Sequence, residues 1–263
     1  MESVAFDILG EREAPVRWLL TVEHASKAVP APLHIHAADA AILDTHWGHD
    51  IGAEPVAAEL CRLLPALAVV ARFSRLVIDA NRDPHDATAI RCHAEGVTLS
   101  FNQPFADPAL EWAQTAMARA EHTRRFTGLH APYHDAIDAE VAAQIAHAER
   151  RAPLRILSLH TFTPVLGAGD RWMEVGVLYD DHEPEALALA RGLEAAGLRT
   201  ALNEPYSGRQ GLIYSPQRHG RRFDVPYLEL ELRQDLLADA AGCARVAQQV
   251  AAALAHFAGP GLA

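Results

Sequence analysis

Three short apolar runs, each followed directly by a histidine or a glutamate, constrain the fold of this chain most. The runs cover residues 18–22, 156–159 and 225–228, and the polar residues that follow them are Glu23, His24, His160, Glu229 and Glu231. Runs of this length are typical of buried strands, and neighbouring parallel strands bring their carboxyl ends to one edge of a sheet. The sequence therefore predicts that side chains from distant segments meet at that edge.

Helix-length segments alternate with the predicted strands. Helices are expected over residues 51–64, 107–128, 133–150, 183–196 and 237–257, and further strands over 67–73, 75–80, 174–179 and 198–202. Residues 81–104 and 203–224 are polar and are expected to be loops. This order predicts one α/β domain over 1–263, a three-layer sandwich with helices on both faces of a mostly parallel mixed sheet, with 105–152 as a possible helical cap.

Composition excludes several classes of protein. Half of the residues are hydrophobic and 22% are charged, as in ordinary globular proteins, while a net charge of −11 disfavours nucleic acid and anionic membranes as partners. Cys61, Cys92 and Cys243 form no CxxC pair, so neither a disulfide framework nor a thiolate zinc site is expected. The chain shows no signal-peptide pattern and no membrane-length apolar run, so we expect a cytoplasmic protein. These features leave the oligomeric state open.

Two histidines and one aspartate are the candidate metal ligands. His24 and His160 each follow a predicted strand, and Asp50 stands directly before a predicted helix. Two imidazoles and one carboxylate, with one open coordination position, form the pattern of catalytic zinc. The alternatives are packing or surface roles for the histidines, an N-cap role for Asp50, and His49 in place of Asp50 as the ligand.

Glu229 and Glu231 are candidates for acid/base catalysis. They alternate with leucines in a predicted strand, so both carboxylates face the same way. A carboxylate beside a metal-activated water is what general base chemistry requires. Either glutamate could take this role, and the alternative is a solvated face on which Arg233 pairs with one of them.

Arginines and a glycine-containing loop are candidates for substrate binding. Arg75 and Arg82 lie at the ends of a segment rich in arginine, aspartate and asparagine, and a guanidinium group binds a carboxylate through two hydrogen bonds. The loop that begins at Asn203 and contains Tyr206 can approach a ligand. The alternatives are structural Arg–Asp pairs and a plain surface turn.

Six motifs, taken in order, resemble the N-formylglutamate amidohydrolase family. They are VEHAS at 22–26, DIGA at 50–53, SRLVIDANR at 74–82, LSLH at 157–160, NEPY at 203–206 and LELR at 230–233. The resemblance spans about residues 18–240 and implies a phosphorylase/hydrolase-like α/β sandwich related to zinc exopeptidases and zinc cell-wall amidases. It also implies a zinc-dependent hydrolase of linear amide bonds.

The resemblance implies a role for each matching residue. His24, Asp50 and His160 are the implied ligands of one zinc ion, with other divalent metals as alternatives, and Glu231 is the implied acid/base. The substrate-binding residues expected on this basis are Arg75, Asn81, Arg82, Asn203, Tyr206 and Arg233.

The substrate expected is a small anionic N-acyl amino acid. N-formyl-L-glutamate, hydrolysed to formate and L-glutamate in amino-acid degradation, fits both the chemistry and the arginines. Residues 85–104 and 209–219 do not match the glutamate-specific members. Another N-acyl amino acid or a peptidoglycan-like amide is therefore an alternative substrate, and a non-catalytic metal-binding protein of the same fold is the alternative of a different class.

Overall fold

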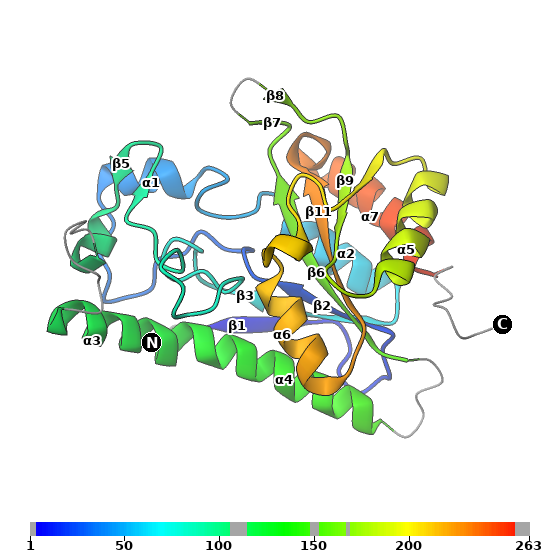
Figure 1. Ribbon diagram of the computed structural model, residues 1–263, viewed down its shortest axis with the longest axis horizontal. Helices are drawn as coiled ribbons and strands as arrows, with labels where there is room; N and C mark the ends of the chain where they lie inside the picture. Colours follow the sequence, from blue (N-terminus) through cyan, green and yellow to red (C-terminus); the bar gives the residue numbers. More distant parts are fainter. Residues whose placement is uncertain (1–3, 106–114, 148–152, 167–168, 256–263) are drawn as a thin grey trace.

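A seven-stranded mixed sheet forms the centre of the molecule in the computed structural model, which describes residues 4–105, 115–147, 153–166 and 169–255 (Figure 1). Its strands, in spatial order, are β1 (Phe6–Leu9), β3 (Ala66–Ala71), β2 (Trp18–Val22), β6 (Arg155–Phe162), β11 (Tyr227–Arg233), β9 (Val175–Leu178) and β10 (Thr200–Leu202). The four strands β3, β2, β6 and β11 run parallel, β9 and β10 are parallel to each other, and the β1–β3 and β11–β9 pairs are antiparallel. The predicted mostly parallel mixed sheet is confirmed.

Helices cover both faces of the sheet. The α-helices are α1 (Ala37–Leu43), α2 (Ala53–Leu63), α3 (Ala116–Arg125), α4 (Ala131–Ala146), α5 (Glu183–Ala195), α6 (Tyr214–Phe223) and α7 (Ala240–Ala255). The apolar faces of α2, α5 and α7 share one hydrophobic cluster, and α4 contributes to the cluster on the other face. In α2, the spacing of Val56 and Leu60 directs both side chains into the first cluster, and each such burial contributes about 1.5–3 kcal/mol.

The long helical region between β3 and β6 differs from its prediction. A π-helical turn, η3 (Phe126–His130), joins α3 directly to α4, so the helix does not end at Gly128 (Figure 1). The predicted start at Asp107 and the predicted end at Arg150 lie outside the described residues. Helix α4 packs against β1, β2 and β3. The single domain and the cap over 105–152 stay predictions.

Residues 75–80 form a turn and no strand, contrary to the prediction. Their apolar side chains are buried, but their backbone groups bond to distant side chains in place of a neighbouring strand. The carbonyl of Leu76 accepts from Asn102 Nδ2 at 2.8 Å, and that of Val77 accepts from Arg125 Nη1 at 2.7 Å. Because these buried carbonyls already accept hydrogen bonds, the segment does not need to pair with a neighbouring strand.

The predicted loop 203–224 contains helix α6, and two N-terminal elements were also missed. Helix α6 is rich in arginine and reads as polar, yet one face, including Ser215 and His219, is buried. Strand β1 and helix α1 lie in segments whose apolar periodicity is weak.

Two short hairpins, β4 (His93–Ala94) with β5 (Val97–Thr98) and β7 (Val165–Leu166) with β8 (Gly169–Asp170), complete the strands. Within the described ranges, no helix is long and apolar enough to cross a membrane.

Gly176, in β9, allows the backbone at Glu204 to pass close to the sheet. It pairs with Glu231, and a Cβ at this position would lie 2.0 Å from the carbonyl oxygen of Glu204. We expect Gly176→Ala to lower the free energy of unfolding by about 1–3 kcal/mol, measured by urea denaturation, because the backbone must shift. Gly128→Ala is the control, since its Cβ would meet nothing within 4 Å. An unchanged unfolding midpoint for Gly176→Ala would contradict this account.

Candidate metal centre and cavity

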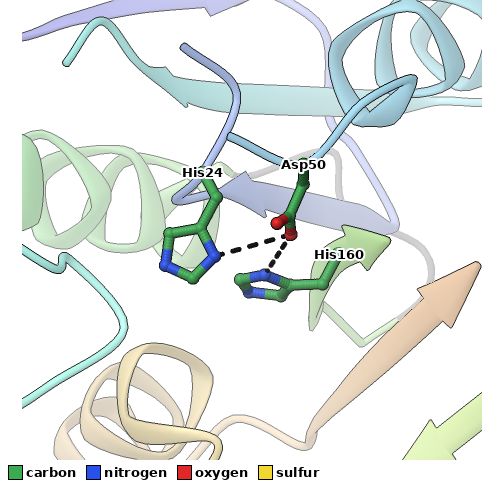
Figure 2. A group of neighbouring side chains, drawn as sticks. All are labelled: His24, Asp50 and His160. Carbon is green, nitrogen blue, oxygen red and sulfur yellow. Dashed lines mark hydrogen bonds and ion pairs between the residues drawn. The ribbon is translucent and has the colours of Figure 1, made fainter. Parts of the chain in front are cut away.

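His24, Asp50 and His160 converge at the carboxyl edge of β2 and β6 (Figure 2). Asp50 Oδ2 lies 2.8 Å from His160 Nδ1 and 3.5 Å from His24 Nδ1, and the candidate ligand atoms all lie within 4.8 Å of one another. All three side chains are buried, and His24 Nδ1 has no hydrogen-bond partner among the described residues. A buried nitrogen that lacks a hydrogen bond and lies beside a second imidazole and a carboxylate fits a divalent metal such as zinc.

Asp50 faces this cluster and does not cap helix α2. The N-cap is Gly52, whose φ of 88° lies in the left-handed region. The carboxylate of Asp50 accepts from the backbone N–H of Thr161 at 3.1 Å, and its own N–H donates to the His24 carbonyl at 2.8 Å. His49, the alternative ligand, directs Nδ1 to the Leu43 carbonyl and lies outside the cluster.

A second carboxylate contacts the other ring nitrogen of each histidine. Asp79 Oδ1 lies 2.7 Å from His24 Nε2, and Glu23 Oε2 lies 3.2 Å from His160 Nε2. Such pairs fix the tautomer and orientation of histidines that bind metals. The sequence assigned neither acid this role, although both stand at the end of an apolar run.

The buried charges change one another's pKa values. Burial opposes ionisation of Asp50, but His24 and His160 outweigh it and hold its pKa below the ordinary range. Burial also opposes charge on His160, yet Glu229, Asp50 and Glu23 raise its pKa well above the usual value. Burial also opposes ionisation of Glu23, but the hydrogen bond and the charge of His160, together with smaller hydrogen-bond contributions, lower its pKa to about 2. The cluster therefore favours a positive charge between its carboxylates.

Glu229 and Glu231 project from the same face of β11, as the alternation with leucine predicts. Strand β11 pairs with β6 so that Glu231 stands beside His160. Glu229 Oε2 accepts from Asn81 Nδ2 at 3.0 Å, whereas Glu231 Oε2 is buried without a hydrogen-bond partner in the described structure. Burial raises the pKa of Glu229 to about 7 and that of Glu231 well above its usual value.

A cavity of about 270 Å³ opens beside the cluster and contains three arginines. Arg75 bridges Asp50 at 3.4 Å and Asp79 at 3.2 Å. Arg82 and Arg91 also line the cavity, and neither pairs with a carboxylate of the described residues. The Arg91 guanidinium lies 5.7 Å from the ring centroid of Trp47. Two arginines are thus available to an anionic ligand.

The structure brings most of the predicted substrate-binding residues to this cavity, but not all. The predicted residues that line it are Arg75, Asn81, Arg82 and Tyr206. Asn203, with φ of 52°, accepts at Oδ1 from the N–H groups of Tyr179 and Gly208 at 3.0 Å and supports its own loop. Arg233 donates to the carbonyls of Arg171 and Met173, both at 3.1 Å. Neither Asn203 nor Arg233 is among the residues that line the cavity.

Comparisons with known proteins agree with this architecture. A model of the N-formylglutamate amidohydrolase family matches residues 16–238. The structure of an Agrobacterium tumefaciens gene product shares 30% identity and a TM-score of 0.81, over 97% of this chain and 96% of that chain. The structure of N-formylglutamate amidohydrolase from Ralstonia eutropha JMP134 shares 17% identity and a TM-score of 0.65, over 95% of each chain. No curated protein sequence matches the chain.

The raised pKa of Glu229 predicts a pH-dependent stability of the metal-free protein. Between its ordinary value of 4.5 and about 7, the folded state holds a proton that the unfolded state has lost, so stability falls as pH rises. We expect Glu229→Gln to raise the free energy of unfolding by up to about 3 kcal/mol at pH 8 and by little at pH 4.5, measured by urea denaturation with chelator. The control is Glu194→Gln on the exposed face of α5. Equal effects of Glu229→Gln at both pH values would contradict the assignment.

Proposed function

The chain belongs to the N-formylglutamate amidohydrolase family, and from this membership we propose that it hydrolyses N-formyl-L-glutamate to formate and L-glutamate with the help of one zinc ion. Membership makes the protein an amide hydrolase. The observation that carries the finer proposal is the convergence of His24, Asp50 and His160 next to Glu231, beside a cavity with two arginines that no carboxylate of the described residues engages.

His24, His160 and Asp50 would hold the metal. The donor set of two nitrogens and one oxygen suits zinc, and Asp79 and Glu23 would keep each imidazole in the required orientation. When bound, zinc would polarise the amide carbonyl and lower the pKa of a water molecule toward about 7. Other divalent metals are compatible with the same donors.

Glu231 is the residue that we assign to proton transfer. Its Oε2 is buried and has no hydrogen-bond partner in the described part of the chain, and the residue pairs with the candidate ligand His160, whereas Glu229 already accepts from Asn81. In the proposed reaction, Glu231 takes the proton of the attacking water. It then passes that proton to the nitrogen of the leaving amine as the amide C–N bond breaks.

Arginines of the cavity would select a substrate with two carboxylates. Arg82 and Arg91 can each form paired hydrogen bonds with one carboxylate, while Arg75 is engaged by Asp50 and Asp79 and would hold these acids in place. The volume of about 270 Å³ suits a small amino-acid derivative. Asn81 and Tyr206 complete the proposed contacts.

A substrate panel with controlled metal content tests the proposal. The panel contains N-formyl-L-glutamate, N-formyl-L-aspartate, N-acetyl-L-glutamate, N-formyl-L-methionine and a muramoyl-alanine amide. We expect the highest kcat/KM for N-formyl-L-glutamate, loss of activity with a chelator and recovery with zinc. Turnover of another compound without N-formyl-L-glutamate would assign a different amidase, and no turnover by the metal-replete protein would favour a non-catalytic role.

The substitution Glu231→Gln separates catalysis from metal binding. Because the amide cannot accept the water's proton, we expect kcat to fall by about 10²–10⁴-fold while the zinc content of the purified protein stays the same. Glu194→Gln is the matched control and should change neither quantity. Full activity of Glu231→Gln, or loss of its zinc, would exclude the assigned role.

A further inference from the structure

A row of buried histidines on the long helix formed by α3, η3 and α4 contacts the segment that carries cavity residues. The contacts are His122 Nε2 to the Pro84 carbonyl at 2.6 Å, His130 Nε2 to the Arg82 carbonyl at 3.1 Å and His134 Nε2 to the Ala80 carbonyl at 3.0 Å. A carbonyl oxygen only accepts, so each imidazole must donate its Nε2–H. We call these three residues the histidine ladder.

The geometry of the helix explains how the ladder stays aligned. The contacted carbonyls belong to alternate residues, 80, 82 and 84, of a segment that forms neither a strand nor a helix. His130 and His134 are four residues apart and share one face of the helix. The wider π-helical turn η3 lies between His122 and His134, and it reduces the rotation that would otherwise carry His122 away from this face.

The segment held by the ladder supplies three groups of the proposed active site. Asp79 contacts His24 at 2.7 Å, Asn81 donates to Glu229 at 3.0 Å, and Arg82 lines the cavity. A hydrogen bond to the Ala80 carbonyl fixes the peptide plane before Asn81, and one to the Arg82 carbonyl fixes the plane after Arg82. The two bonds therefore restrict the backbone on both sides of Asn81 and Arg82.

We propose that His130 and His134 are positioning residues that orient Arg82 and Asn81 toward the substrate through the Arg82 and Ala80 carbonyls. This inference rests on the proposed function, because it assumes that Arg82 binds a substrate carboxylate. Neither histidine lines the cavity, so the proposed effect on the reaction passes through the segment that both hold.

His130 is the better residue to test, because its side chain makes one hydrogen bond among the residues that the structure describes. Its Nδ1 is buried without a hydrogen-bond partner among the described residues, and burial lowers its pKa to about 4, so the ring is neutral near pH 7. His134 has a second contact, with Nδ1 placed 2.8 Å from His219 Nε2, and His219 in turn contacts Asp138 at 2.7 Å. Replacing His134 would disturb that chain as well.

A matched pair of variants distinguishes the effect of losing the hydrogen-bond donor from the effect of changing the side-chain volume. His130→Leu removes the donor, whereas the amide nitrogen of His130→Gln can replace Nε2. With N-formyl-L-glutamate, we expect His130→Leu to raise KM about tenfold with a smaller change in kcat, and His130→Gln to stay within about threefold of the parent. The zinc content should be equal in all three proteins, because the ladder does not touch His24, Asp50 or His160.

A double-mutant cycle with Arg82→Gln shows whether His130 acts through Arg82. If it does, His130→Leu should raise KM much less in the Arg82→Gln background than in the parent. Equal effects in both backgrounds, an unchanged KM for His130→Leu, or identical losses in His130→Leu and His130→Gln would overturn the inference. Should His130→Leu not fold, His130→Asn, whose amide is too short to reach the carbonyl, takes its place in the cycle.

The parent protein separates a failure of this inference from a failure of the proposed function. An active parent with an unaffected His130→Leu variant overturns the positioning role alone. If the parent prefers another compound of the panel, the double-mutant cycle is run with that compound, and the same outcomes decide whether His130 is a positioning residue. A metal-replete parent that neither turns over any panel compound nor binds N-formyl-L-glutamate in calorimetry overturns both.

Discussion

Burial of charge at the carboxyl edge of β2, β6 and β11 is the constraint on which the rest of the site depends. The buried carboxylates there are Glu23, Asp50, Asp79, Glu229 and Glu231. Arg75 supplies positive charge next to Asp50 and Asp79. Histidines that bind a metal are neutral, so the carboxylates carry an excess of negative charge, which a divalent cation would reduce. Without a cation, protons must take its place, and the raised pKa values of Glu229 and Glu231 are the result.

The register of the sheet determines where these charged residues lie relative to one another. Parallel pairing of β11 with β6 sets Glu231 beside His160, and antiparallel pairing with β9 sets Gly176 on its other side. Because Gly176 has no side chain, the backbone at Glu204 can pass close to the sheet there. That passage leads to Tyr206, which lines the cavity. The two pairings of β11 thus determine the setting of the proposed acid/base and the approach of a cavity loop.

The sequence alone predicts the parts of the site that depend on strand ends. The approach of His24 to His160 follows from apolar runs that end at one edge of a sheet, and the shared face of Glu229 and Glu231 follows from alternation, whereas Asp50 is proposed from the donor set and the family resemblance. The partners Asp79 and Glu23 could not be assigned, because a hydrogen bond between segments far apart in the chain leaves no periodic signal. The family resemblance also implied substrate contacts for Asn203 and Arg233, but the side chains of both bond to backbone groups, and neither residue lines the cavity.

Residues 75–84 show most clearly why local patterns were insufficient. The apolar residues 76–78 read as a strand, but Asn102, Arg125 and the histidine ladder satisfy the carbonyls of this segment from other elements. A segment that forms neither a paired strand nor a helix can place Asp79, Asn81 and Arg82 at the site only if other elements fix its backbone. Histidine suits this task, since a neutral imidazole donates a hydrogen bond without the cost of burying the charge of lysine or arginine. Its flat ring also packs against neighbours, and the His130 and His134 ring centroids lie 4.4 Å apart. One face of the long helix thus contacts the segment that carries Asp79, Asn81 and Arg82 through three histidines, a feature that the sequence analysis did not predict.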